Sequence, residues 1–263
     1  MILDKKETEE IICFVCECER SDIYLKKVEV SQSQNRRIQE ITAQRKTGKP
    51  LAYCMNSKYF YDREFFVDEN VLIPRQDTEF LIENILKNET GEKKNVLELG
   101  TGSGIISQIL QSQRPHWQIA SIDISFEATK IARRNCEERI LIINSDKFSA
   151  IREQRIFDII VSNPPYIEST EIENLDISVK DYEPKIALDG GETGLDFYGY
   201  LAQTARNYLK GKGRIYCEIG FNQGNSVPNI FKENNFANIR MVKDFGDNPR
   251  VVCAEVPRKD EKY

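Results

Sequence analysis

From residue 95 onward, segments with the pattern of buried strands alternate with segments of helical pattern. The expected strands are NVLELG, WQIASID, ILIINSD, FDIIVSN and GRIYCEIG. The expected helices are GIISQILQSQ, SFEATKIARRNCEE, GLDFYGYLAQTARNYLK and QGNSVPNIFKEN. Because strands that are joined through helices pair in parallel, this alternation predicts a mostly parallel, doubly wound α/β sheet. The final segments ANIRMVKDF and RVVCAEV are separated by a short turn, so we expect them to be antiparallel to each other.

The chain before residue 95 has a different pattern. Residues 1 to about 48 place apolar side chains such as Ile11, Val15 and Ile41 at helical spacing among many charges. The aromatic and β-branched stretch KYFYDREFFVDENVLI then predicts a β-hairpin with its turn near Asp62 or Asp68.

A further helix is predicted by PRQDTEFLIENILK, residues 74–87. Phe80, Leu81 and Ile85 have helical spacing, and Asp77 or Thr78 can cap the first turn. This helix leads into the alternating region, so the sheet begins directly after it.

Composition and charge argue against several classes of protein. The chain has 263 residues, of which 40% are hydrophobic and 30% charged, and its net charge of -5 argues against a protein that coats nucleic acid. No apolar run approaches the ~20 residues of a membrane span, and the acidic N-terminus lacks a signal-peptide core. We therefore expect a cytoplasmic protein that neither enters a membrane nor binds nucleic acid stably.

The seven cysteines are mostly scattered, which is typical of reduced thiols. Cys13, Cys16 and Cys18 form the one cluster, but His116 is the only histidine and no second ligand pair lies nearby. We expect ordinary thiols on a helix here and no metal site.

A glycine-rich loop, LELGTGSG, connects the first strand of the alternating region to the next helix. In open parallel sheets, ligands bind beyond the carboxyl ends of the strands. The spacing G-x-G-x-G differs from the dinucleotide motif, whose third glycine is replaced by Ile105. Glu98 stands just before Gly100, where a carboxylate would repel a pyrophosphate but would suit a cation such as an amino group or a sulfonium.

Two further carboxylates stand at strand ends. Asp123 ends the second strand, where it can accept hydrogen bonds from ribose hydroxyls, and Asp146 ends the third, where it can accept from an adenine amino group. Together with Glu98 and the glycines they predict a pocket for S-adenosylmethionine, whose product is S-adenosylhomocysteine. The alternative interpretation is a glycine-rich turn with helix-capping acids.

The motif NPPY follows the fourth expected strand, which lies next to the first in such a sheet. Asn163 and the carbonyl of Pro164 offer two acceptors that can hold the N–H groups of a planar amide, and the prolines stiffen both. Tyr166 can stack on the planar group. Methylation of adenine, of guanine or of a glutamine side chain fits this arrangement, and a simple Pro-Pro turn with an asparagine strand cap is the structural alternative.

From about residue 44 onward the sequence resembles the protein-(glutamine) methyltransferases that modify peptide chain release factors. The resemblance is carried by RKTGKPLAY, FFVDENVLIPRQDTEFLIE, LELGTGSG, SNPPYI, YEPKIALDGGETGLDFY, EIG with Gln223, and DFGDNPRVV. It implies a class I S-adenosylmethionine-dependent methyltransferase fold with a seven-stranded sheet. It also implies a helical N-terminal substrate-recognition domain over residues 1–57, a β-hairpin linker over 58–73 and a methyltransferase domain over 74–263.

The resemblance also assigns site residues. The expected cofactor residues are Glu98, Gly100, Thr101, Gly102, Ser103, Gly104, Asp123, Asp146, Lys147, Phe148 and Asn163. The expected substrate residues are Asn163, Pro164, Pro165, Tyr166, Arg75 and Glu79, of which Asn163, Pro164 and Tyr166 are the expected catalytic residues. The sequence departs from the family pattern at Gln76, often proline, at Asn56, often glycine, and at Lys147, frequently an aromatic residue. Either the stem of Lys147 or the ring of Phe148 can cover the adenine.

The implied activity is methylation of the glutamine in the Gly-Gly-Gln loop of release factors by a monomeric enzyme. Methylation of a ribosomal-protein glutamine uses the same motifs and stays open as an alternative. An adenine-modifying nucleic-acid methyltransferase is less favoured because no long basic stretch flanks NPPY. A non-catalytic cofactor-binding scaffold is disfavoured by the intact NPPY and glycine loop.

Overall fold

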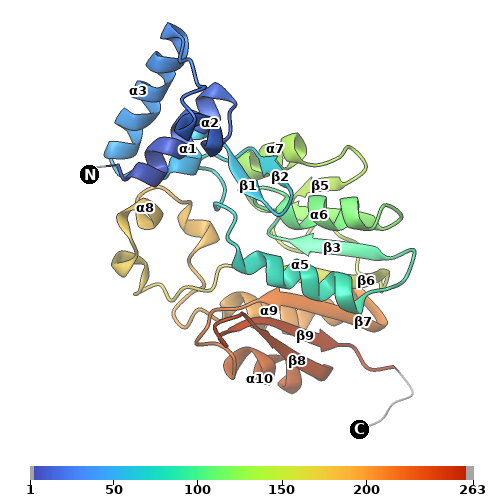
Figure 1. Cartoon of the computed structure of the whole chain (residues 1–263). Helices are drawn as coiled ribbons and strands as arrows, with labels where there is room; N and C mark the ends of the chain where they lie inside the picture. Colours follow the sequence, from blue (N-terminus) through green and yellow to red (C-terminus); the bar gives the residue numbers. More distant parts are fainter. Residues whose placement is uncertain (1–2, 259–263) are drawn as a thin grey trace.

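The computed structural model describes residues 3–258 and is built around a seven-stranded sheet (Figure 1). The strands are β3 (Asn95–Leu99), β4 (Gln118–Asp123), β5 (Leu141–Asn144), β6 (Phe157–Ser162), β7 (Leu209–Glu218), β8 (Ala237–Lys243) and β9 (Pro249–Glu255). They lie in the order β5-β4-β3-β6-β7-β9-β8, and the first five are parallel to one another. β9 is antiparallel to both of its neighbours. The predicted α/β fold class is thereby confirmed.

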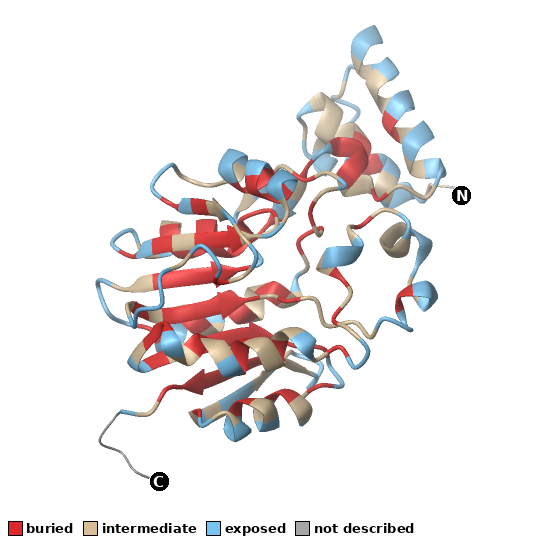
Figure 2. Ribbon diagram, turned by 180° about the vertical axis from the view of Figure 1, so that it is seen from behind, coloured by how far each residue is buried: buried red, intermediate tan, exposed pale blue. Residues whose placement is uncertain are grey.

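Helices cover both faces of the sheet. One face packs against α5 (Asp77–Asn88), α6 (Ile105–Gln113) and α7 (Phe126–Asn135), and the other against α9 (Asp196–Thr204) and α10 (Ser226–Glu233). Side chains alternate between the faces, so Val96 joins the first core while Leu97 and Leu99 join the second. Figure 2 shows the central strands buried and the outer helix surfaces exposed. This two-sided burial explains why the strands read as nearly continuous apolar runs.

The N-terminal region is helical, as the sequence predicts. It contains α1 (Lys5–Cys16), α2 (Arg20–Tyr24), α3 (Gln32–Lys46) and α4 (Leu51–Met55), whose shared core includes Ile11 and Ile41. The hairpin of β1 (Lys58–Phe60) and β2 (Arg63–Phe65) follows, with its turn at Asp62. Tyr53 of α4 and Val71 of the following segment pack against Ile131 of α7, which docks this region onto the sheet.

Two local expectations need correction. Neither Asp77 nor Thr78 caps α5: the N-cap residue is Gln76, without a side-chain cap, and Thr78 bonds across the protein instead. The helix predicted over GLDFYGYLAQTARNYLK is shorter, because α9 passes into the 3-10 turn η3 (Ala205–Asn207) and Leu209 already pairs in β7.

The chain directly after NPPY was assigned no element from the sequence. It contains the short helical elements η1 (Ile172–Asn174), α8 (Ile177–Lys180) and η2 (Lys185–Ala187), for which the sequence had no clear periodic signal. We call residues 164–195 the connecting segment. It lies between the carboxyl ends of the parallel strands and the N-terminal helices (Figure 1).

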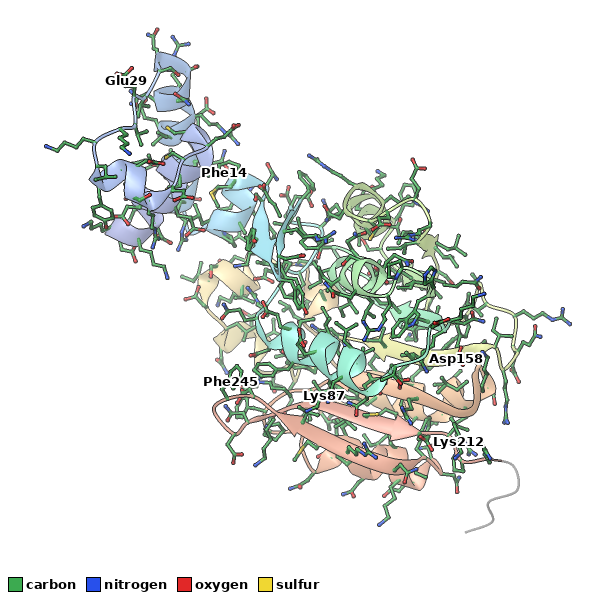
Figure 3. The ribbon with its side chains drawn as sticks, turned by 45° about the vertical axis from the view of Figure 1, so that its right-hand side comes forward. Phe14, Glu29, Lys87, Asp158, Lys212 and Phe245 are labelled. Carbon is green, nitrogen blue, oxygen red and sulfur yellow. The ribbon has the colours of Figure 1, made fainter. Side chains whose placement is uncertain are left out.

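Figure 3 shows which end of the sheet faces this connecting segment. Asp158, near the start of β6, and Lys212 of β7 lie at the opposite end of the sheet from Phe14 and Glu29 of the N-terminal region. The carboxyl ends of the parallel strands therefore point toward the N-terminal region and the connecting segment. This is the edge at which ligands bind in open α/β sheets.

The described residues contain no helix with the length and hydropathy that crossing a membrane requires. Cys13, Cys16 and Cys18 carry free, partly exposed thiols, and no three His, Cys, Asp or Glu side chains of residues 3–258 meet in a way that could hold a metal ion.

Candidate active site

A cavity of about 570 Å³ opens at the carboxyl edge of the sheet. Its walls come from the segment before α5, the loops after β3, β4, β5 and β6, and the connecting segment with the start of α9. The structure brings eleven of the sequence-predicted residues to this wall: Arg75, Glu98, Gly100, Thr101, Gly102, Ser103, Asp123, Asp146, Lys147, Asn163 and Pro165. Residues from five separate parts of the chain thus meet at one place.

The glycine loop is tied to the neighbouring strand. The backbone N–H groups of Gly100 and Thr101 donate to the carbonyl of Ile122 at 2.8 and 3.0 Å. Gly102 has φ 52°, and a Cβ there would meet nothing within 4 Å, so its backbone stands open beside the cavity. At Gly104, a Cβ would lie 2.6 Å from Sγ of Cys136, so this glycine permits close packing on α7.

Asp123 holds the loop from the end of β4. Its Oδ2 accepts from the N–H of Gly102 at 2.8 Å, and its Oδ1 accepts from the N–H of Ser125 at 2.9 Å. Burial raises the pKa of Asp123, and these backbone bonds oppose that rise. Each carboxylate oxygen keeps a further lone pair, so Asp123 can still accept from a ligand in the cavity.

Glu98 is fully buried at the end of β3. Oε2 accepts hydrogen bonds from the hydroxyls of Ser107, Ser121 and Thr101, the last two at 2.6 and 3.2 Å. Oε1 is buried and has no protein partner. Burial raises the pKa of Glu98 to about 7, although the three hydroxyl bonds lower it. A carboxylate with an unpartnered buried oxygen in a cavity wall is suited to a cationic ligand group.

Asn163 follows β6 directly beside the glycine loop. Its Nδ2 donates to Oγ1 of Thr78 at 3.1 Å, and Thr78 Oγ1 donates to Oε2 of Glu218 at 2.7 Å. Thr78 and Glu218 were not assigned to the site from the sequence. The only available signal was that Glu218 ends a predicted strand, in EIG, as the other site carboxylates do.

The backbone of Tyr166, the last residue of NPPY, is fixed by contacts with Gln223 and Gly194. The Nε2 of Gln223 donates to the carbonyls of Tyr166 and Gly194 at 3.1 and 3.0 Å. A Cβ at Gly194 would lie 2.4 Å from the Tyr166 carbonyl oxygen, so only glycine fits this close approach. The connecting segment therefore folds back on the motif and fixes its backbone.

Arg75 links the cavity to the connecting segment. Its guanidinium pairs with Oε1 of Glu183, whose Oε2 accepts from the N–H of Ile73 at 3.4 Å. The hydroxyl of Tyr182, the residue before Glu183, donates to the backbone carbonyl of Thr47 at 3.0 Å. Burial raises the pKa of Glu183, and the Arg75 cation opposes that rise. These contacts join the N-terminal region, the segment before α5 and the connecting segment.

Five of the predicted site residues do not line the cavity: Gly104, Phe148, Pro164, Tyr166 and Glu79. Phe148 is buried and stacks on Tyr208 with ring centroids 4.2 Å apart. Lys147 does line the cavity, and its Nζ lies 4.9 Å from the ring centroid of Tyr200, which also lines it. Of the two residues considered for covering an adenine, only Lys147 stands at the wall.

Sequence reasoning missed several other wall residues: Asp189, Asp196, Phe197 and Tyr200. They lie in the stretch LDGGETGLDFYGY, which contributed to the family resemblance and to a predicted helix but to no assigned site residue. Two acids and two aromatic residues next to a glycine cluster were the signal that could have indicated them.

The Arg75–Glu183 pair generates a prediction about stability. Arg75→Ala should leave a buried carboxylate without its cation and lower the free energy of unfolding at pH 8 by about 1–3 kcal/mol. This is less than the ~3–5 kcal/mol of a fully buried pair, because the Arg75 side chain is 39% exposed. Without Arg75 the folded-state pKa of Glu183 rises further, so the loss should shrink as the pH falls and the carboxyl is protonated.

Urea denaturation at pH 8 and pH 5.5 measures this effect. The double variant Arg75→Ala, Glu183→Gln is the matched control and should recover most of the stability at pH 8. A loss that is equal at both pH values, or that the double variant retains, would contradict the assigned role of the pair.

Two family models match the chain. Residues 75–178 match the methyltransferase small domain, and residues 3–55 match the PrmC N-terminal domain. A methyltransferase structure from Pyrococcus furiosus superposes with a TM-score of 0.56 over 74% of this chain and 89% of that one. At 16% identity this likeness shows the fold alone.

Curated relatives are more similar. A release factor glutamine methyltransferase of Thermodesulfovibrio yellowstonii is 36% identical over 259 residues, which cover 95% of this chain and 92% of that protein. Another, of Streptococcus pneumoniae, is 41% identical over 220 residues, which cover 82% of this chain and 78% of that protein. The chain therefore belongs to the family of release factor glutamine methyltransferases.

Proposed function

We propose that this chain transfers a methyl group from S-adenosylmethionine to the side-chain amide nitrogen of a glutamine, and that its substrate is the Gly-Gly-Gln loop of peptide chain release factors. The observation that carries the proposal is the position of Asn163, which stands in the cavity wall beside the glycine loop with its amide nitrogen already bonded to Thr78. Family membership supports the same activity.

The cavity residues fit the cofactor. The unpartnered Oε1 of Glu98 suits a cationic group, Asp123 keeps lone pairs for ribose hydroxyls, and Asp146 with Lys147 lines the cavity after β5, where we place the adenine. The backbone from Gly100 to Ser103 lines the cavity and lets the cofactor approach closely. When bound, S-adenosylmethionine supplies a methyl group on a sulfonium, a strong electrophile.

The protein's task is to hold a poor nucleophile in line. An amide nitrogen is planar and delocalised, so its N–H groups must be directed to fixed acceptors. Nδ2 of Asn163 is committed to Thr78, which leaves the Asn163 Oδ1 as an acceptor for the substrate amide. The carbonyl of Pro164 is the second proposed acceptor, while Pro165 and Tyr166 flank the glutamine, and Arg75 and Glu79 lie toward the substrate entrance.

We extend the proposal to the division of labour along the chain. Residues 1–57 would recognise the protein substrate, 58–73 would link, and 74–263 would carry out the chemistry. The match of residues 3–55 to an N-terminal family model supports this division, as does the contact of Tyr182 with Thr47 near the cavity. The enzyme would act as a monomer in the cytoplasm, where the free thiols in the described residues would stay reduced.

The function is tested by incubating the protein with methyl-labelled S-adenosylmethionine and one candidate substrate at a time. Release factor should be labelled, and a release factor with alanine in place of the Gly-Gly-Gln glutamine should not. Labelling of ribosomal protein or nucleic acid in preference to release factor would replace the proposal by one of the two alternatives.

Asn163 gives the sharpest test of the chemistry. Asn163→Ala removes one acceptor and lets the substrate amide rotate, so single-turnover methylation of release factor should slow by about 10²–10³. Cofactor affinity, measured by calorimetry, should fall much less because the glycine loop and Asp123 remain. Near-normal turnover in Asn163→Ala would show that the asparagine does not orient the substrate.

The raised pKa of Glu98 leads us to expect proton release when the cofactor binds. A cation bound beside Glu98 stabilises its ionised form, so a carboxyl with a pKa of about 7 should lose up to about half a proton per molecule at pH 7. Cofactor affinity should correspondingly rise as the pH rises through 7. Calorimetry in buffers with different ionisation enthalpies measures the released protons.

Glu98→Gln is the control for that measurement and should abolish the release. The product S-adenosylhomocysteine, which keeps the amino group but lacks the sulfonium charge, shows which cation Glu98 senses. Equal release in the wild type and in Glu98→Gln would remove Glu98 from the cofactor site.

A further inference from the structure

We infer that Thr78 and Glu218 are positioning residues for Asn163: the ionised Glu218 carboxylate sets the direction of a hydrogen-bond chain that turns the Asn163 amide oxygen toward the substrate. This inference rests on the proposed function. It concerns two residues that act through Asn163 rather than on the reacting atoms.

The three side chains come from distant parts of the sequence. Glu218 ends β7 and is 1% exposed, Thr78 lies in the first turn of α5 and is also 1% exposed, and Asn163 follows β6. The distances are 2.7 Å from Thr78 Oγ1 to Glu218 Oε2 and 3.1 Å from Asn163 Nδ2 to Thr78 Oγ1. Water has little access to the first two groups, so their partners are set by the protein.

Proton counting fixes the direction of the chain. An ionised carboxylate only accepts hydrogen bonds, so the single hydroxyl proton of Thr78 must point to Glu218. Thr78 Oγ1 is then left with lone pairs and must accept from Asn163, which requires Nδ2 rather than Oδ1 to face it. The amide oxygen is consequently the atom of Asn163 that remains available as an acceptor.

Protonation of Glu218 on the oxygen that faces Thr78 removes the acceptor that fixes this direction. With its proton on Oε2, the carboxyl donates to Thr78, the Thr78 proton is freed to point to Asn163, and the amide turns so that Oδ1 accepts it. Asn163 would now present N–H groups where the substrate amide also presents N–H groups. Two donors facing each other cannot hold the substrate nitrogen in line, so this state should bind the cofactor but transfer the methyl group poorly.

The surroundings of Glu218 place this change near neutral pH. Besides Thr78 and Asn163, the titratable and charged groups around Glu218 are Asp77 on α5, Arg250 on β9, Tyr166 after β6 and Tyr198 on α9. The Tyr198 hydroxyl donates to the backbone carbonyl of Glu218 at 2.8 Å. Burial raises the pKa of Glu218 to about 7; Asp77 adds to the rise, while Thr78, Arg250 and Asn163 oppose it. The carboxylate, and with it the active orientation, therefore prevails above pH 7 and is lost as the pH falls.

The test measures kcat for release factor methylation at saturating cofactor between pH 5.5 and 8.5. In the wild type, kcat should fall through a single ionisation near pH 7. Glu218→Gln should lower kcat and flatten this limb, because a glutamine amide does not titrate. A limb that persists unchanged in Glu218→Gln would overturn the inference.

Thr78 variants separate positioning from folding. Thr78→Val keeps the shape but removes the hydroxyl, and kcat should fall by about 10- to 100-fold with little change in KM or cofactor affinity. Thr78→Ser restores the hydroxyl and should restore most of kcat. Thr129→Val is the matched control, since Thr129 is a buried threonine whose hydroxyl bonds only to the Phe126 carbonyl within α7, and kcat should not change. Full kcat in Thr78→Val would also overturn the inference.

A readout without substrate keeps the inference independent of the proposed activity. The side-chain ¹⁵N signal of Asn163 should shift with the same midpoint as the ¹³C signal of the Glu218 carboxyl, and this shift should vanish in Glu218→Gln. If the wild type labels no release factor, the proposed function fails while these titrations still decide whether Glu218 turns Asn163. Signals of Asn163 that ignore the Glu218 titration would refute the hydrogen-bond chain.

Discussion

The parallel pairing of β3 with β6 is the constraint on which the site depends. Leu99 and Ser162 are register partners at the last position of the two strands, and the Ser162 hydroxyl locks the pair by donating to the Leu99 carbonyl at 2.7 Å. The residues that follow, Gly100 and Asn163, must therefore emerge side by side. A Cβ at Gly100 would lie only 3.9 Å from the Asn163 carbonyl oxygen. A slip in this register would separate the glycine loop from NPPY, so the proposed cofactor and substrate sites would no longer be adjacent.

Buried carboxylates surround this junction, and burial is unfavourable for their charged forms. Glu98 and Glu218 are both buried, both lie within two residues of a strand's carboxyl end, and both have pKa values raised to about 7, yet their hydrogen bonds differ. Glu98 accepts from three hydroxyls on one oxygen and leaves the other without a partner. Glu218 is linked through Thr78 to Asn163. The arrangement at Glu98 suits a positively charged ligand group, whereas the arrangement at Glu218 orients the side-chain amide of Asn163.

The connecting segment contacts three other parts of the chain next to the cavity. Gly194 and Gln223 hold the Tyr166 backbone, Glu183 binds Arg75, and the Tyr182 hydroxyl reaches Thr47. This segment has little regular secondary structure, so its conformation depends on those contacts rather than on backbone ladders. Through it, the N-terminal helices and the carboxyl edge of the sheet are joined by side-chain contacts.

The sequence by itself determined the order of strands and helices, the antiparallel end of the sheet, the glycine loop and the acids at the strand ends, because periodicity, turn residues and strand termini are local properties. It also led to the correct family through its motifs. Only the tertiary structure decided that Thr78 does not cap α5 but bonds to Glu218, that Phe148 packs on Tyr208 while Lys147 faces the cavity, and that Arg75 is paired with Glu183. The physical reason is sequence separation. These partners lie 140, 60 and 108 positions apart, and a hydrogen bond, ring stacking or ion pair across such a span leaves no periodic trace in either segment.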